Sequence, residues 1–428
     1  MSPSDDHQPE PVEVTNAIID ADRGYRSGTA QAALRNRDFR FVWGGTFASN
    51  IGTWMQNVLL GAFAFQLTHD VGYVGLVYFA QLGPLLFLAP VGGLIADVVD
   101  RRRYLVLMQM IQLILSLGLA GIATADKPNE TAVLLCVLAI GIANALSAPA
   151  LGAILPTLVP REDLPGAVSL QSVQMNLSRV IGPAIGAPLY TVFGAAPVFA
   201  INALTYLFAV AGLLIAHYNA RPSSHLSGGP LEKVTSGFHI AKSDPLIRRI
   251  LITMTVFSFF SLMFVGLMPE IAHTNFGIPP KSISYGFLYA LFGLGAALGA
   301  ITVGTFLAHR SKALVARRAL VAFSVLLAWF ALIRNEYLAY VVVLLLGFAY
   351  FLVITSLSTV LQDHLDDVNR GRVTALWIMS FGGTVPVGVL LAGYVVENLM
   401  TITTVVLFGA AVAIALAPYC DLRRDGAQ

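Results

Sequence analysis

Long apolar stretches recur along the chain and are separated by short polar ones. From about residue 40 onward, twelve stretches reach the ~20 apolar residues that a helix needs to cross the hydrocarbon core of a membrane. They are continuously apolar rather than alternating, which favours helices over the strands of a barrel. The expected spans are residues 41–66, 72–97, 103–124, 131–157, 166–191, 196–217, 247–271, 283–308, 317–334, 337–362, 373–396 and 401–419.

Composition supports the membrane assignment independently. The chain has 428 residues, of which 56% are hydrophobic and 12% charged, and its mean hydropathy is +0.73. These values exclude an ordinary soluble protein of this length. We therefore expect an all-α integral membrane protein whose surface partner is the lipid bilayer. The net charge of +2 comes from basic residues scattered along membrane edges, so it does not indicate a nucleic-acid partner.

The distribution of basic residues predicts the orientation. If the amino terminus is cytoplasmic, 22 of the 26 lysine and arginine residues fall in cytoplasmic segments. Lys127, Lys281 and Arg334 fall outside, and Arg179 lies within a span. The positive-inside rule then predicts a multi-pass protein with both termini in the cytoplasm.

An internal repeat divides the chain. The segment from Tyr73 to Ala80 resembles the segment from Tyr285 to Ala290, and residues 92–97 align with residues 304–309. We therefore predict two pseudo-symmetric six-helix halves. The expected regions are a disordered cytoplasmic tail at 1–38, a first half at 39–217, a cytoplasmic linker at 218–246, a second half at 247–419 and a short tail at 420–428. The two cysteines, Cys136 and Cys420, lie at different expected depths, which argues against a disulfide.

One loop carries the most specific motif. Gly92 and Gly93 are followed by Asp97, and then by an acidic and basic run from Asp100 through Arg101 and Arg102 to Arg103. This charged cluster interrupts two apolar spans at an expected membrane surface. A carboxylate at Asp97 is suited to accept hydrogen bonds from the exposed amides at the start of a neighbouring helix, and to gain from its dipole.

This loop closely resembles motif A of the major facilitator superfamily. Further segments resemble the bacterial enterobactin-exporter-like branch, which exports siderophores and drugs. They are Ser49–Gln56, Leu155–Leu164, Asn176–Gly186 and Arg370–Val373. The resemblance implies two helical halves that rock around a mid-membrane substrate site. It also implies that Asp97 contacts the start of the eleventh span and holds the cytoplasmic side closed, with Arg101, Arg102 and Arg103. The alternative is that these charges only set the topology.

Arg179 is the only strong base within an expected span. An ionised side chain there costs ~2.5 to 3.5 kcal/mol on insertion scales, so it should face a partner or an aqueous cavity. It is the leading candidate for the substrate or coupling site, unless it snorkels to the surface. The following Gly182, Pro183 and Gly186 resemble the glycine–proline motif of drug:proton antiporters, although Ser178 replaces the usual first glycine. Tight helix packing is an equal alternative for these three residues.

Further candidates come from polar and aromatic residues expected in the bundle interior. Glu270 follows Pro269 at the outer end of the seventh span, where solvation is expected but a proton-carrying role stays open. Gln56, Asn57, Phe260 and Trp377 suit a cavity with few fixed charges, although each alone also suits helix contacts or core packing. Arg370 and Arg372 lie in the loop between the tenth and eleventh spans, near Asp363, Asp366 and Asp367.

The sequence excludes several other classes. It has no Gly-Lys pair, so the phosphate loop of an ATP-driven pump is absent. It has no His-Glu-x-x-His metal site and no expected mid-membrane carboxylate pair, which argues against an intramembrane protease. These absences predict a protein that is not an enzyme and needs no cofactor or metal. The resemblance to the exporter branch and to the antiporter motif implies a monomeric antiporter in the bacterial inner membrane that uses protons to expel a small amphipathic molecule. The alternatives are a proton-coupled importer of a nutrient and a non-transporting sensor on the same fold.

Overall fold

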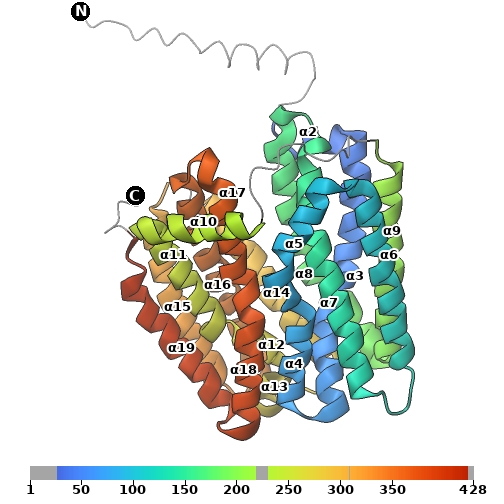
Figure 1. Cartoon of the computed structure of the whole chain (residues 1–428). Coiled ribbons are helices and arrows are strands. Elements are labelled where there is room, and N and C mark those ends of the chain that lie inside the picture. Colours follow the sequence, from blue (N-terminus) through green and yellow to red (C-terminus); the bar gives the residue numbers. More distant parts are fainter. Residues whose placement is uncertain (1–26, 218–229, 308, 423–428) are drawn as a thin grey trace, which may run out of the picture.

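A computed structural model describes residues 27–217, 230–307 and 309–422, and these residues form helices and no strands. Figure 1 shows two groups of long helices standing side by side. The first group contains α2 (Ala30–Arg35), α3 (Arg37–Thr68), α4 (Val71–Leu82), α5 (Pro84–Val98), α6 (Arg101–Ile122), α7 (Glu130–Ile154), the turns η1 (Leu155–Thr157) and η2 (Arg161–Asp163), α8 (Leu164–Phe193) and α9 (Ala195–Ile215).

The second group begins with a helix that lies across the end of the bundle (Figure 1). Its elements are α10 (Pro230–Ser243), α11 (Pro245–Val256), η3 (Phe257–Ser261), α12 (Met263–Gly266), α13 (Met268–Phe276), α14 (Ile283–Gly304), α15 (Lys312–Leu332), α16 (Glu336–His364), α17 (Asp367–Ile378), η4 (Met379–Gly383), α18 (Thr384–Asn398) and α19 (Ile402–Tyr419). The helix α2 and the end of α19 lie at the same end of the bundle, which we call the tail face; the opposite end is the far face.

The twelve expected spans are all present. Their ends differ from the prediction by six residues or fewer. Ten of the described helical segments are long and apolar enough to cross a membrane by length and composition. The other two crossings are α3 with 32 residues and α8 with 30 residues, whose polar and basic residues lower their mean hydropathy. At ~1.5 Å per residue both are long enough to traverse the bilayer, so the chain is a multi-pass membrane protein.

Three of the crossings are interrupted helices. The second crossing breaks at Gly83, because Pro84 lacks the N–H that would continue the hydrogen-bond ladder of α4 into α5. The seventh and eleventh crossings each contain five residues of π-helix, at Phe257–Ser261 and Met379–Gly383. Such π segments often mark functional positions in helices, and these breaks let the crossings bend around the centre of the molecule.

The internal repeat is confirmed in register. In the first half, Asp70 caps α4 by accepting a hydrogen bond from the backbone N–H of Tyr73 (3.0 Å). In the second half, Ser282 caps α14 by accepting one from the backbone N–H of Tyr285 (3.2 Å). The matched tyrosines therefore stand at equivalent positions of the second and eighth crossings.

The predicted tail differs from the structure near its end. Residues 1–26 lie outside the described residues, but α2 is a helix within the region expected to be disordered. Ala32 and Ala33 on α2 are fully buried. Asp163 ties this helix down, because its carboxylate accepts hydrogen bonds from Gly28 N (3.2 Å) and Asn36 Nδ2 (3.3 Å). The short helix α2 forms here because the first half supplies a surface against which its alanines pack.

The two halves meet chiefly through two helix pairs, with smaller contacts between α5 and η4, α5 and α10, and α3 and α13. The outer part of α4 packs on α18, and α8 packs on α14. Glycines permit the first contact, since a Cβ on Gly75 would stand 3.0 Å from the backbone oxygen of Val389, and one on Gly393 would stand 2.8 Å from that of Val71. Small residues let helix backbones approach closely, as is common in membrane bundles.

Candidate functional site

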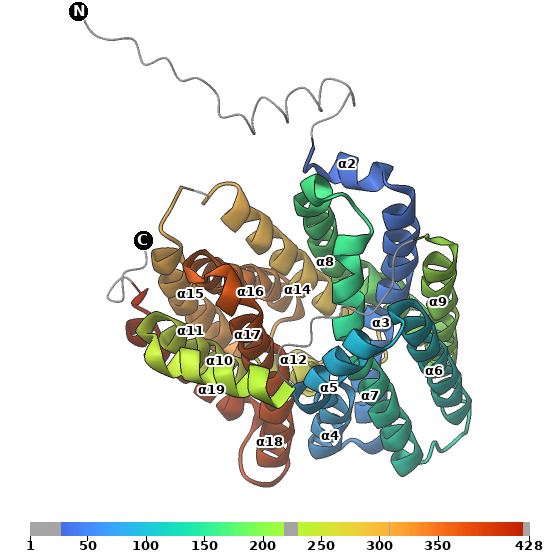
Figure 2. The same cartoon turned by 45° about the horizontal axis from the view of Figure 1, so that its top comes forward.

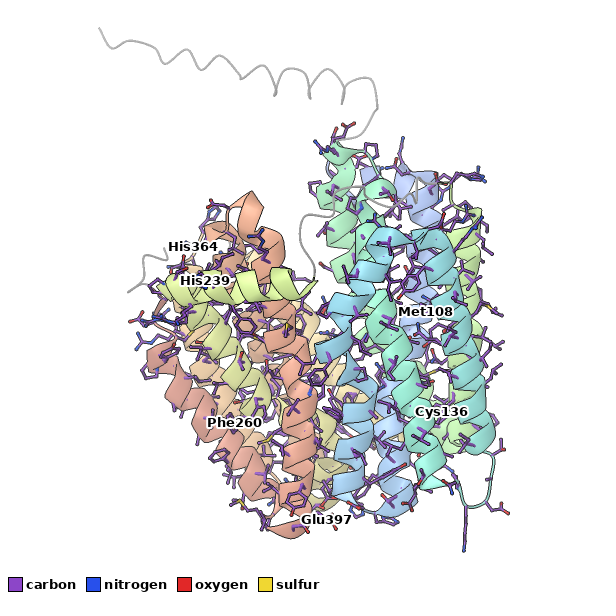
Figure 3. The ribbon with its side chains drawn as sticks, viewed as in Figure 1. Met108, Cys136, His239, Phe260, His364 and Glu397 are labelled. Carbon is purple, nitrogen blue, oxygen red and sulfur yellow. The ribbon has the colours of Figure 1, made fainter. Side chains whose placement is uncertain are left out.

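The seam between the halves is closed at the far face. Glu397 near the end of α18 accepts a hydrogen bond from the backbone N–H of Val71, the first residue of α4 (N to Oε2, 3.2 Å). Beside this contact, the rings of Phe65 and His273 lie 5.6 Å apart between their centroids. Figure 3 shows Glu397 at the far end of the bundle. Contacts between the two halves therefore hold this end together.

Toward the tail face the two halves are in contact through α5, which touches α10 and η4, while α8 and α14 carry exposed side chains. The faces of α8 and α14 that touch at mid-height continue through residues that become exposed. On α8 these are Met175 and Val168, which are 42% and 49% exposed, and on α14 Ile301 is 57% exposed. Figure 2, with the tail face brought forward, shows α8 and α14 side by side. Along this part of the seam, α8 and α14 thus present apolar side chains that no other described part of the protein covers.

Arg179 stands on α8 between these exposed side chains and the far face. Its guanidinium carbon lies 4.8 Å from the centre of the Trp54 ring on α3 and 5.1 Å from the centre of the Phe351 ring on α16. A Cβ on Gly293 of α14 would stand 3.1 Å from the backbone oxygen of Arg179, so α8 and α14 touch at this height. The side chain does not snorkel to the surface; it lies where the two halves converge.

Aromatic rings from the second half cluster around Phe351. Phe292 on α14 and Tyr350 on α16 are stacked, with centroids 5.5 Å apart and planes 23° apart. Tyr350 also contacts Phe351 edge-on at 5.0 Å and Phe381 of η4 at 6.5 Å. We call Phe292, Tyr350, Phe351 and Phe381 the aromatic wall. The first half supplies the cation and the second half supplies the wall.

The glycine–proline stretch of α8 packs on both halves. A Cβ on Gly182 would stand 2.7 Å from the backbone N of Met55, and a Cβ on Gly186 would stand 2.3 Å from Cγ of the same residue on α3. Ser178, one turn earlier on the same face, is fully buried. Pro183 presents its backbone oxygen to Gly286 on α14. These residues set the close approach of α8 to its neighbours, which is the packing role that the sequence left open.

The motif A residues make their described contacts within the first half. Asp100 is the N-cap of α6, accepting a hydrogen bond from Arg103 N (2.9 Å). Arg101 donates from Nε to the backbone oxygen of Ala96 (3.0 Å), and Arg102 donates to the backbone oxygen of Leu214 on α9. These contacts join the ends of α5, α6 and α9 into one unit at the tail face.

The glycine pair of motif A has unequal roles. A Cβ on Gly92 would stand 2.4 Å from the backbone oxygen of Leu146 on α7, whereas one on Gly93 would meet Pro149 only at 3.9 Å. The close packing of α7 on α5 therefore requires a glycine at position 92 and not at position 93. The side chains of Asp97 and Arg370 lie outside the described residues, so their predicted gating contacts stay predictions.

The remaining predicted residues are dispersed. Arg372 is exposed on α17 and Trp377, on the same helix, is buried. Phe260 packs against Phe259 and Phe408 at 4.7 and 5.8 Å between centroids, and it lines an apolar groove of about 280 Å³ between η3, α18 and α19. The groove lies on the flank of the second half and away from the seam (Figure 3).

Two predicted amides act between helices of the first half. Gln56 is buried and its Oε1 accepts hydrogen bonds from Ser116 Oγ (2.9 Å) and Asn202 Nδ2 (2.8 Å). This network joins α3, α6 and α9. Asn57 accepts a hydrogen bond from Gln81 Nε2 (2.5 Å), which joins α3 to α4. For both residues the structure shows the helix contacts that were the alternative to a role in a cavity.

Glu270 lies near the far face. Its Oε1 accepts a hydrogen bond from Thr274 Oγ1 (2.5 Å). It lines an open groove of about 810 Å³ together with Arg334, Glu397 and Thr403. Among the described residues, every Asp and Glu lies in the first or last turn of a helix or outside helices. The predicted position of Glu270 at the outer interface therefore matches its place in the bundle.

Sequence reasoning missed several residues at the seam. Trp54 lies in a first-span segment that stands out only by its family resemblance. Phe351 lies in an apolar stretch, and Phe381 stands among small residues, so neither has a local signal. Glu397 sits four residues before the next span and resembles an ordinary loop charge. Cys136 and Cys420 are both free, as their predicted depths required. No cluster of potential metal ligands occurs in the part of the chain that the structure describes.

Comparison with known proteins identifies the fold and the family. The profile of the transmembrane secretion effector family matches residues 28–424. Among curated proteins, the chain is 27% identical to the staphyloferrin A transporter of Staphylococcus aureus over 82% of this chain and 88% of that one. It is 30% identical to the enterobactin exporter EntS of Escherichia coli over 79% and 80% of the two chains.

Solved transporters share the fold at low sequence identity. The nucleoside transporter NupG aligns with a TM-score of 0.73 at 14% identity, covering 91% of this chain and 99% of that one. A POT family transporter in complex with 5-aminolevulinic acid aligns with a TM-score of 0.71 at 11% identity, covering 90% and 95%. The profile match spans nearly all of the described residues. The chain therefore belongs to the transmembrane secretion effector family of major facilitator transporters.

Proposed function

We propose that this transporter is a bacterial inner-membrane exporter that uses the proton gradient to expel a small amphipathic molecule by alternating access. The tail face is the cytoplasmic side in this proposal, because most basic residues flank that end. The single observation that carries the mechanism is the asymmetric seam. It is held at the far face by Glu397 and Val71, and toward the tail face from Arg179 the helices α8 and α14 carry exposed apolar side chains such as Met175 and Ile301.

In this proposal the described conformation is the inward-facing one. A substrate enters from the cytoplasm and reaches the mid-membrane level of Arg179 and the aromatic wall. The halves then rock about the α4–α18 and α8–α14 contacts, so that the far face opens and the tail face closes. Motif A would stabilise the closed tail face through Asp97, while Arg101 and Arg102 keep the end of the first half rigid.

The direction of transport is supported by the relatives. The family is named for transmembrane secretion, and the relative EntS is named as an exporter of enterobactin. An inward-facing state by itself serves an importer equally well, since an importer releases its cargo through the same opening. We propose the monomer as the working unit, because each chain contains both halves of the seam.

The proton carrier belongs to the same proposal. Glu270 is our candidate because it lines the far-face groove beside Glu397, whose contact between the halves the cycle would break. In the cycle, the Glu270 carboxylate would take up a proton from the outside. Its hydrogen bond from Thr274 would break only when the halves rearrange. Glu270→Gln should abolish the response to a pH gradient and preserve exchange of substrate for substrate.

Efflux from cells tests the proposal. Cells expressing wild type, Asp97→Asn, Arg179→Ala or the surface control Arg37→Gln would be loaded with a panel of fluorescent drugs and a catecholate siderophore. We expect protonophore-sensitive efflux in wild type and in the control, and its loss in the other two variants. Inverted membrane vesicles then fix the direction, because an exporter accumulates substrate in them when energised. Release under the same conditions would identify an importer, and no transport across the panel would favour a sensor.

A further inference from the structure

We infer that Arg179 is the anion-binding group of the transport site and that its ligand is an aromatic acid, in which a carboxylate is carried directly by a planar ring. This inference rests on the proposed function, because it names the substrate class of the same site. Three observations carry it: the lack of an acceptor for the guanidinium, its position between rings from both halves, and the aromatic wall beside it.

The guanidinium has no partner of opposite charge in the described part of the chain. Nε of Arg179 is buried and makes no hydrogen bond. The described carboxylates all lie near helix ends or in loops, far from mid-height. A charge removed from water without a counter-ion is costly. The protein keeps this arginine where α8 and α14 touch, which is the expected arrangement when the counter-ion arrives with the ligand.

The rings of Trp54 and Phe351, one from each half, both lie close to the guanidinium. Their centroids lie 4.8 and 5.1 Å from its central carbon. Cation–π contacts of this kind leave the N–H groups at the edge of the guanidinium free to donate hydrogen bonds. A carboxylate matches that planar fork with two parallel hydrogen bonds. A neutral amide lacks the charge, and a cationic drug would be repelled.

The aromatic wall defines the body of the ligand. Phe292 and Tyr350 are stacked, and Phe351 and Phe381 flank Tyr350. Aromatic rings prefer offset-stacked or edge-to-face neighbours over aliphatic chains. A planar ring attached to the carboxylate would extend this cluster when the acid group reaches Arg179. An aliphatic acid would pair with the charge of Arg179 but would make no ring–ring contacts with the aromatic wall.

The geometry also ties binding to the cycle. Arg179 and Trp54 belong to the first half, whereas Phe351 and the rest of the wall belong to the second. A ligand that pairs with the cation and stacks on the wall bridges the two halves. It would reach them from the tail face, past the exposed side chain of Met175. Binding of the acid would thereby draw the open ends of α8 and α14 together.

Titration calorimetry on the full chain in lipid nanodiscs tests this inference without any gradient. The probes are naphthoate, its neutral amide naphthamide, and octanoate, which has the charge and no ring. We expect wild type to bind naphthoate at least about tenfold more tightly than naphthamide, and several-fold more tightly than octanoate. This comparison needs no variant, so a folding defect cannot obscure it. Equal affinities for the acid and the amide would overturn the inference.

Variants locate the effect. Arg179→Gln should bring naphthoate down to the affinity of naphthamide, and Arg179→Lys should keep part of the preference for the acid. The matched control is Arg37→Gln, since Arg37 also lies over a ring, that of Phe41 at 5.7 Å, but at the exposed start of α3. An unchanged acid preference in a folded Arg179→Gln protein would place the anion site elsewhere.

Failure of this inference and failure of the proposed function give different results. Protonophore-sensitive efflux with no acid preference in calorimetry would leave the exporter standing and remove the aromatic acid as its cargo. Tight, Arg179-dependent binding of naphthoate without efflux would support the site and count against export.

Discussion

The carboxylate of Glu397 on α18 accepts a hydrogen bond from the first amide of α4, at Val71, and so joins the two halves at the far face. Asp70 caps the same helix start from within its own half by accepting from Tyr73 N (3.0 Å). The amino end of α4 therefore binds two carboxylates, one from each half. Because unpaired amides and the helix dipole both favour anions there, this contact stabilises the closed far face.

Removing Glu397 should shift the balance between conformations. A hydrogen bond to an exposed carboxylate contributes about 1 kcal/mol, which is roughly a fivefold change in a population ratio. We expect Glu397→Ala to reduce by that factor the ratio of molecules open at the tail face to molecules closed there. Pulsed electron resonance between labels at Val168→Cys and Ile301→Cys would report this as a shift toward shorter distances.

The control for Glu397 is Glu336→Ala. Glu336 also lies at the far face, but its carboxylate bonds to Tyr340 within the same helix. This variant should leave the distance distribution unchanged. Equal effects of the two variants would mean that the contact between the halves has no influence on the conformational balance.

Gly182→Ala should destabilise the protein through packing. The new Cβ would stand 2.7 Å from the backbone N of Met55 and 2.9 Å from the backbone oxygen of Ile51, so α3 and α8 would have to separate. Overpacking of this kind costs about 1 to 3 kcal/mol. The thermal unfolding temperature of the purified protein should fall.

Two other glycines calibrate that result. Gly186→Ala should cost less, because the nearest atoms belong to the flexible side chains of Met55 and Leu59. Gly152→Ala, in α7 with nothing within 4 Å of the new Cβ, should be neutral or stabilising. If Gly182→Ala unfolded like wild type and lost only proton coupling, the motif would act in coupling rather than in packing.

Gln56→Leu should weaken the first half and leave substrate preference unchanged. The substitution removes the acceptor of Ser116 and Asn202, both fully buried. An unsatisfied buried polar group costs about 1 to 3 kcal/mol. Thermal unfolding and the efflux profile across the drug panel would be measured together. An altered efflux profile with an unchanged unfolding temperature would instead indicate that Gln56 contacts the substrate.

Asp244 should contribute stability that depends on pH. This residue caps α11 and its Oδ2 lies 2.8 Å from Nε2 of His364 at the end of α16. Burial alone would raise the pKa of the Asp244 carboxyl, but hydrogen bonds from His364 and from the amides of Ile247 and Leu246 lower it below its usual 3.8. Because the folded pKa is depressed, the stabilisation is complete above about pH 4 and is lost as the pH falls through the folded value.

The matched variant for this test is Asp244→Asn. At neutral pH it should unfold at a lower temperature than wild type, by an amount corresponding to about 1 kcal/mol. The difference should shrink below pH 4, as the wild-type carboxyl becomes protonated and loses its charge. A difference that stayed constant down to pH 3 would show that the charge of Asp244 contributes nothing.

The sequence by itself determined the membrane class, the twelve crossings and the two-half plan. These follow from signals that are local in the chain: apolar length, the placement of arginines and lysines, and the repeat that matches Tyr73 with Tyr285. The same locality made Arg179 recognisable, because a charge inside an apolar stretch is visible without any partner. Motif A was recognisable in the same way, because its residues follow one another in a single loop and resemble those of a known family.

Only the tertiary structure decided which polar residues meet. Gln56 and Arg179 both read as polar residues inside spans, yet one closes a network among three helices and the other stands unpaired at the seam. The partners of Arg179 come from α3 and α16, which lie some three hundred residues apart in sequence. Helix rotation and the choice of neighbour set these contacts, and both arise from packing of whole faces rather than from any local pattern. The pairing of Glu397 with Val71 has the same origin, since it exists only where the halves close.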